Sequence, residues 1–140
     1  MKLQTLINRI AAECPAFGGR VLGAGALPEA PGTVALPGLP CALVLRTLDD
    51  MKPSVTAGGV TQPAEIWFNV AVCVDNSADA LGHAADDQLE DIKTSLIAAL
   101  VGWTPDGANQ SPMEYRGFKH IGQDAARFWR RFEFALQLGG

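Results

Sequence analysis

The sequence predicts an α+β domain in which an antiparallel or mixed sheet of about four to five strands carries two main helices on one face. Three observations lead to this fold class. Apolar residues recur with helical spacing in two segments, and four other segments have the alternation or apolar run of a strand. The order along the chain is helix, two strands, helix, two strands. Strands that follow one another usually pair as hairpins, which favours an antiparallel sheet. The 140 residues suffice for one domain with its own core, which we assign to residues 1–140.

The first element is a helix over residues 3–14, because its apolar residues follow the spacing of one helix face: Leu3, Leu6, Ile7, Ile10 and Ala11. Pro15 and the pair Gly18–Gly19 end this helix. The segment 18–40 is rich in Gly and Pro, and we expect an irregular connection there, in which residues 20–22 could form a short strand.

A hairpin follows this connection. Residues 41–47 are apolar on both faces, as in a strand with few exposed sides. Residues 64–74 are the clearest strand, with one face formed by Ile66, Phe68, Val70, Val72 and Val74. Between them, the polar segment 48–63 is predicted to be a long, mobile loop. A loop of this length is uncommon in a compact domain unless it has a function.

The main helix is predicted over residues 79–101, with a buried face of Leu89, Ile92, Leu96 and Leu100. Its acidic residues crowd the first half, where they complement the helix dipole. Gly102 suits the left-handed turn that ends a helix. Residues 113–121 and 127–138 are predicted strands. In the second, alternation places Arg130 on the face of Phe128 and Phe132, and Arg131 on the opposite face.

Composition argues against export and against several kinds of partner. Asn8, Arg9 and Glu13 interrupt the N-terminal segment that a signal peptide would need, and no apolar run is long enough for a membrane span. The net charge of −4 gives no overall attraction to nucleic acid or to an anionic membrane. The cysteines are odd in number and widely spaced, so we expect buried thiols rather than a disulfide or zinc site: Cys14, Cys41 and Cys73.

Catalytic motifs and cofactor motifs are weak in this sequence. The "GAGALP" stretch at residues 23–28 contains only a fragment of a nucleotide-binding loop, and the helix precedes it instead of following it. His83 and His120 have no carboxylate or Cys at recognised ligand spacing. The acidic residues after position 85 lack the pattern of a calcium loop. We therefore expect no enzyme, no cofactor and no metal.

Charged residues are segregated along the chain. Residues 75–91 contain six acids and no base, whereas residues 116–131 contain five bases and one acid. Two interpretations stay open: the bases pair with the acids inside one subunit, or the two regions form a head-to-tail interface between copies. The candidate interface residues are Asp49, Asp50, Lys52, Asp86, Asp87, Glu90, Arg130 and Arg131.

Trp103 stands three residues beyond Leu100 and therefore continues the buried stripe of the main helix. Thr104, Pro105 and the Asp106–Gly107 pair then turn the chain away. This position favours a hydrophobic plug at the helix end, with an exposed binding platform as the alternative.

Three segments together resemble the phage tail terminator proteins, including the family related to minor tail protein U of lambdoid phages: "AADDQLEDIKTSLIAALVGWTPDG", "SPMEYRGFKHI" and "ARFWRRFEFAL". The segments "RVLGAG", "LPCALVL" and "AEIWFNVAVCV" fit the same layout, so the resemblance spans nearly the whole chain. The Pro-rich stretch 28–40 departs from it, since many relatives have a short helix there. The residues that match a structural signature are Gly102, Trp103, Pro105, Gly107, Tyr115 and Gly117.

The resemblance implies a structural protein of virion assembly. Six subunits would form a ring that caps the tail tube, ends its growth and presents a surface for joining the head. The implied partners are further copies of the chain, the major tail tube protein and a head-completion or neck protein. The implied locations are the host cytoplasm during assembly and then the virion tail, and the loop 48–63 would project toward a neighbour or the tube.

Other readings remain beside this one. A head-closure or neck connector protein would have almost the same sequence features. A small enzyme or nucleotide-binding domain would need a convergent polar pocket around His120 or the turn at 18–25. A small-ligand-binding domain would need an unfilled apolar cavity between sheet and helices.

Overall fold

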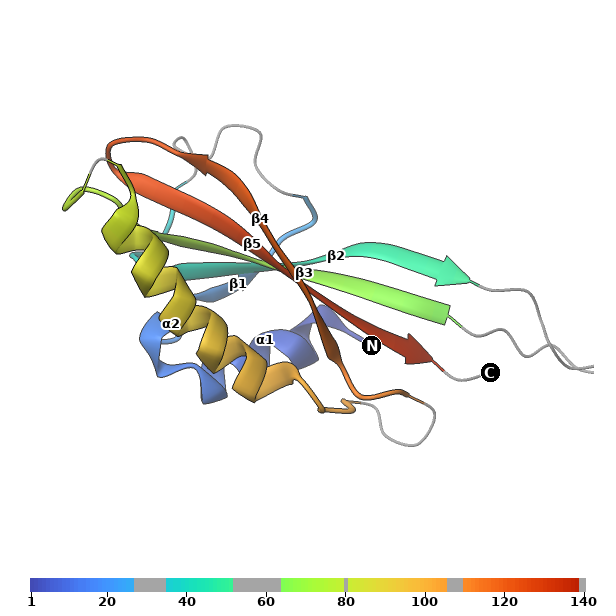
Figure 1. The fold of residues 1–140 in the computed structure, drawn as a ribbon. Coiled ribbons are helices and arrows are strands. Elements are labelled where there is room, and N and C mark those ends of the chain that lie inside the picture. The colour runs from blue at the N-terminus through green and yellow to red at the C-terminus, as the bar shows by residue number, and fades with distance from the viewer. Residues whose placement is uncertain (27–34, 52–63, 80, 106–109, 139–140) are drawn as a thin grey trace, which may run out of the picture.

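A computed structural model describes residues 1–26, 35–51, 64–79, 81–105 and 110–138, and it confirms the predicted α+β class (Figure 1). The helices are α1 (Leu3–Glu13) and α2 (His83–Leu100), with a short 3-10 turn, η1 (Pro15–Phe17), after α1. The strands are β1 (Val21–Gly23), β2 (Cys41–Met51), β3 (Ala64–Asp75), β4 (Glu114–Gln123) and β5 (Arg127–Leu138).

The five described strands form one mixed sheet in the order β1-β2-β3-β5-β4. The predicted hairpins are present, because β2 pairs with β3 and β4 pairs with β5, both antiparallel. The long strands β3 and β5 also pair with each other, so that the last strand lies between β3 and β4. Strand β1 is the parallel member, running alongside β2.

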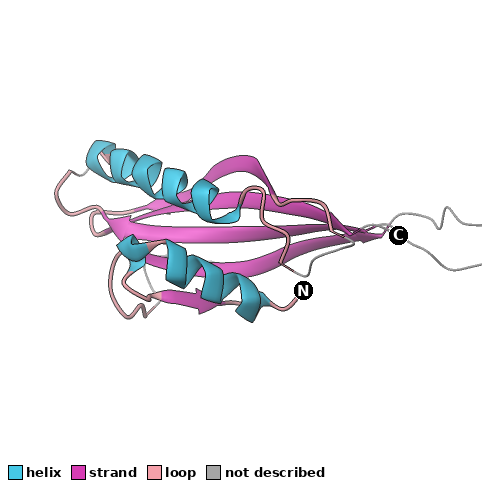
Figure 2. Ribbon diagram, turned by 90° about the horizontal axis from the view of Figure 1, so that it is seen from below, coloured by secondary structure: helices cyan, strands magenta, loops and turns pink. Residues whose placement is uncertain are grey.

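Both helices pack on the same face of the sheet, as Figures 1 and 2 show. The main core lies between the two layers. From α1 it takes Leu6 and Ile10, and from α2 the predicted stripe of Leu89, Ile92, Leu96 and Leu100. The predicted face of β3, from Ile66 to Val74, lies in this core, and so do Phe128, Phe132 and Phe134 of β5. The helical and strand periodicities of the sequence therefore predicted which residues are buried.

A smaller apolar cluster lies on the opposite face of the sheet. Its buried members are Leu43, Leu45, Ala71, Cys73 and Trp129. Ala24, Leu36 and Leu39, from the Gly- and Pro-rich connection, pack against it. The connection therefore covers one half of this face.

Several element boundaries differ from the prediction. Residues 48–51, expected in the loop, extend β2, where Leu48 lies opposite Trp67 and Asp49 opposite Ile66. The remainder of the predicted loop, including Lys52, lies outside the described residues. Helix α2 begins at His83 instead of residue 79, because the Asp79 side chain accepts a hydrogen bond in a preceding turn and Gly82 is left-handed, with φ of 85°.

Candidate subunit interface

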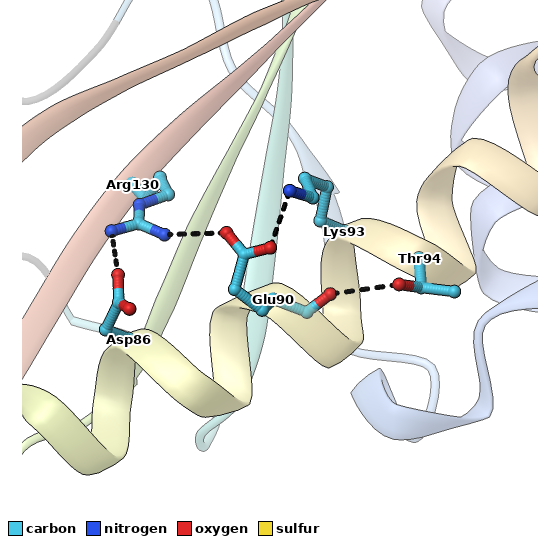
Figure 3. Close-up of polar contacts among 5 residues, drawn as sticks. All are labelled: Asp86, Glu90, Lys93, Thr94 and Arg130. Atoms are coloured by element: carbon cyan, nitrogen blue, oxygen red, sulfur yellow. Dashed lines mark hydrogen bonds and ion pairs between the residues drawn. The ribbon is translucent and has the colours of Figure 1, made fainter.

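Arg130 lies on the helix face of the sheet, as the alternation of β5 predicted. Its side chain is only 6% exposed and contacts two acidic residues of α2. Nη2 donates a hydrogen bond to Asp86 Oδ1 at 2.5 Å, and Nη1 lies 3.7 Å from Glu90 Oε1 (Figure 3). Glu90 in turn pairs with Lys93 at 2.5 Å, and this hydrogen bond raises the pKa of the lysine. Two bases thus balance two acids within one subunit.

Aromatic rings complete the surroundings of Arg130. Its guanidinium carbon lies 4.2 Å from the centre of the Phe118 ring and 5.8 Å from that of Phe128. A shallow groove of about 430 Å³ opens beside it, lined by Leu81, Gly82, His83, Asp86, His120, Gln123, Phe128 and Arg130. His120 packs on Phe128 with ring centres 4.8 Å apart, and His83 pairs with Asp87 at 3.4 Å. Among the described residues that line the groove, there is no Ser, Thr, Cys or Lys nucleophile beside a base.

Arg131 lies on the opposite face of the sheet and has different partners. Its side chain is 25% exposed, and Nη2 lies 3.3 Å from Glu133 Oε1. Lys119 of β4, whose side chain is 64% exposed, lies 3.7 Å from the same carboxylate oxygen. Arg116 pairs with Glu114 at 3.1 Å and stands over the Trp67 ring at 5.2 Å.

The structure places most of the predicted interface residues. Arg130, Asp86 and Glu90, which are candidates for contact between copies, pair with one another inside the subunit, and their contact with a second copy stays a prediction. The other interpretation of the charge segregation, internal pairing, therefore holds for these three residues. Asp87 and Arg131 remain on the surface. Asp49 is exposed on β2 and lies 4.0 Å from Arg46, whereas Asp50 is half-buried opposite Glu65. Lys52 lies outside the described residues.

Lys119 and Arg116 are surface bases that the site prediction missed. Their place could not be read from alternation, because β4 has two register shifts, between Tyr115 and Gly117 and between His120 and Gly122. Each shift reverses the relation between sequence position and face. The clustering of bases in residues 116–131 was the available signal in the sequence, but it does not indicate on which face of the sheet each base lies.

The described signature residues lie just after α2 and in the first part of β4. Gly102 is left-handed with φ of 85°, as predicted, and its N–H donates to the Met113 carbonyl at 2.9 Å. Gly117 has φ of 118° and lies at the first register shift of β4. Tyr115 packs on Phe134, with ring centres 5.4 Å apart. Pro105 is half-buried, and Gly107 lies outside the described residues.

Trp103 is half-buried and packs against the main core, so it is closer to the predicted plug than to an open platform. The Arg9 guanidinium covers its ring at 5.0 Å, and Arg9 Nε also donates to the Ala99 carbonyl at 3.0 Å. The residue thus joins the end of α2 to α1. Its ring is not fully buried, which the position in sequence could not show.

The three cysteines are buried free thiols, as predicted. Burial raises the pKa of Cys14 to about 11, that of Cys73 to about 12, and that of Cys41 in the same direction. Such thiols are poor nucleophiles, because the thiolate is the reactive form.

Among the residues that the structure describes, no three His, Cys, Asp or Glu side chains form a metal-binding group. No helix in the described ranges is long and apolar enough to cross a membrane.

Comparisons with known proteins agree with this structural picture. The family model described as phage tail terminator protein matches residues 1–139. A chain of a solved structure, "Virion of native gene transfer agent (GTA) particle", has 18% sequence identity and a TM-score of 0.56, and the match covers 95% of this chain and 90% of that chain. This second likeness shows a shared fold. No curated protein matches the chain. The family match covers almost the full length, and the chain therefore belongs to the phage tail terminator family and has a structural role in the phage tail.

Proposed function

We propose that this chain caps the phage tail tube as a ring of six identical subunits. In this role it ends elongation of the tail and provides the surface to which the head is joined. The observation that carries the proposal is the family match, which covers residues 1–139. The partners are further copies of the chain, the major tail tube protein and a head-completion or neck protein.

The described surface supports a structural role as a subunit of a ring. A ring of identical subunits requires heterologous contacts, in which one surface of a subunit meets a different surface of the next. A two-layer subunit has two unlike outer faces, the helix layer and the open side of the sheet, and Figure 1 shows both described helices on one side of the sheet. The ring would assemble in the host cytoplasm and remain in the virion tail.

The proposal is tested with purified tail tube protein from the same phage. The tube protein is allowed to polymerise with and without this chain, and the lengths of the tubes are measured by negative-stain electron microscopy. We expect shorter tubes with a ring at one end when the chain is present. Tubes that grow to the same length, with no ring at their ends, would contradict the capping role. Binding to filled heads but not to tubes would instead indicate a neck connector.

A further inference from the structure

Among the described residues, only a part of the sheet face that points away from the helices is covered by other segments. The Gly- and Pro-rich connection covers the half around Trp129. On the other half, no described helix or strand lies above the sheet. The side chains there include Leu48, which is 49% exposed, and the half-buried Trp67. We call this half the open sheet face and define it by Leu48, Trp67, Arg116, Lys119 and Arg131.

The residue types of the open sheet face are those of protein interfaces. Trp and Arg are enriched at the centres of such interfaces, where they supply most of the binding energy. Trp67 is held in place from two sides, because its indole N–H donates a hydrogen bond to Glu65 and the Arg116 guanidinium stacks over its ring. A held aromatic side chain loses little conformational entropy when a partner covers it.

The open sheet face carries an excess positive charge at one end. Lys119 and Arg131 share a single carboxylate, that of Glu133. Arg116 is balanced by Glu114. Glu65 and Asp50 lie opposite each other toward the other end of β2 and β3, away from this pair of bases. A partner should therefore bring negative charge to the Lys119–Arg131 end.

The outer side of α2 carries an excess of negative charge, which is complementary to the positive charge of the open sheet face. Arg130 and Lys93 balance Asp86 and Glu90, as described above. Asp87 pairs only with His83 among the described residues, and Asp91 makes no ion pair with them. Both side chains are exposed and lie one helical turn apart. Leu89 and Leu96 of α2 pack with Phe132 of β5 in the main core, so α2 lies on the side of the sheet opposite to Arg131 and the open sheet face (Figure 1).

We infer that the open sheet face of one subunit binds the Asp87–Asp91 side of α2 of a second copy of this chain. Because the two surfaces lie on opposite sides of the subunit, the contact is head-to-tail and leaves both surfaces available for further copies, as a ring requires. Asp87 and Asp91 face Lys119 and Arg131, and Trp67 supplies the apolar contact. This inference rests on the proposed ring and specifies its interface.

The test is a charge exchange between two exposed residues, Lys119→Glu and Asp91→Lys, made singly and together. Self-association is measured by sedimentation velocity, alone and with tubes of the phage's tube protein, at low and high salt. Each single reversal should weaken association about tenfold or more, which corresponds to the loss of one favourable contact between charges. The double variant should recover most of the loss, because it restores opposite charges. Wild-type association should weaken with salt.

The controls separate this interface from a general effect of charge. Lys2→Glu and Glu13→Lys reverse exposed charges on or beside α1 and should leave association unchanged. Urea unfolding checks that each variant is folded. If the single variants associate normally while the wild-type chain still caps tubes, the inference is wrong and the proposed function stands. Normal association with lost capping would assign the open sheet face to the tube. A wild-type chain that stays monomeric both free and on tubes would contradict both proposals.

Discussion

Arg130 and Arg131 are neighbours in sequence, yet the sheet gives them different roles. Arg130 points to the helix layer, is nearly buried and contacts Asp86 and Glu90. Arg131 points to the open sheet face, is a quarter exposed and shares Glu133 with Lys119. The difference teaches that a cluster of bases in the sequence does not define a surface. The buried base is committed to the fold, and only the exposed one remains for a partner.

The largest expected effect is that of Arg130→Glu, which places a third carboxylate beside Asp86 and Glu90 in a largely buried site. We expect it to lower the free energy of unfolding by about 3–5 kcal/mol, as for a buried ion pair that loses one partner. Arg131→Glu is the matched control and should change stability less, because the Arg131 side chain is 25% exposed, against 6% for Arg130. Urea unfolding followed by circular dichroism measures both. Equal losses in the two variants would contradict the comparison.

Arg130 and Arg131 are both among the interface residues predicted from the sequence, so reversal of the two charges together would be the direct test of self-association. With Arg130 inside the subunit, that double variant would unfold or weaken the fold and could not report on an interface. Arg131 and Lys119 are the bases to change.

Sequence alternation predicted the opposite directions of Arg130 and Arg131, because β5 follows the strand period without interruption. It could not identify Asp86 as a partner, since that contact spans 44 residues and depends on how α2 lies over the sheet. The faces of Arg116 and Lys119 were also beyond prediction, because the register shifts of β4 leave no pattern in a single sequence. The helix start was misplaced because Asp79 suits the first turn of a helix, whereas the left-handed conformation of Gly82, which separates it from α2, leaves no pattern in a single sequence.

The second prediction concerns Gly82, which positions the first turn of α2 and hence Asp86. Its φ is 85°, and an added Cβ would lie 2.7 Å from the Phe128 ring, which also contacts Arg130. Gly102 has the same φ, with no atom within 4 Å of an added Cβ. We expect Gly102→Ala to lower stability by about 1–2 kcal/mol from backbone strain, and Gly82→Ala by about 2–4 kcal/mol from strain plus overlap.

Thermal and urea unfolding of the two alanine variants separates these contributions. Because the backbone strain is nearly the same, the difference between the variants measures the contact with Phe128. If Gly82→Ala were no worse than Gly102→Ala, the start of α2 would be free to move, and the close pairing of Asp86 with Arg130 would not depend on this glycine.

Trp103 allows a third prediction, at the other end of α2. A fully buried ring would make Trp103→Ala cost about 3–5 kcal/mol. The observed half-buried ring makes about 2 kcal/mol the expected loss, because part of its apolar surface already faces water. Arg9→Gln should lower stability by at most about 1 kcal/mol, since the cation–π contact lies near the surface. Urea unfolding measures the loss in each variant and distinguishes a fully buried Trp103 ring from a half-buried one. No change in Trp103→Ala would overturn the role of this residue as a plug.

The smallest effect on stability is expected for Arg131→Gln, and it is the most informative about association. The folded subunit should change by less than about 1 kcal/mol, because the Arg131 side chain is partly exposed and Glu133 keeps Lys119 as a partner. Glu133 would then be balanced by Lys119 alone, and the excess positive charge of the open sheet face would disappear. Self-association should therefore become weaker and less dependent on salt. Arg130→Gln would show the reverse pattern, with a destabilised subunit and an unchanged salt dependence among the molecules that remain folded. An equal change in self-association in the two variants would contradict this prediction. The effect would then come from the net charge of the subunit and not from the face of the sheet on which each arginine lies.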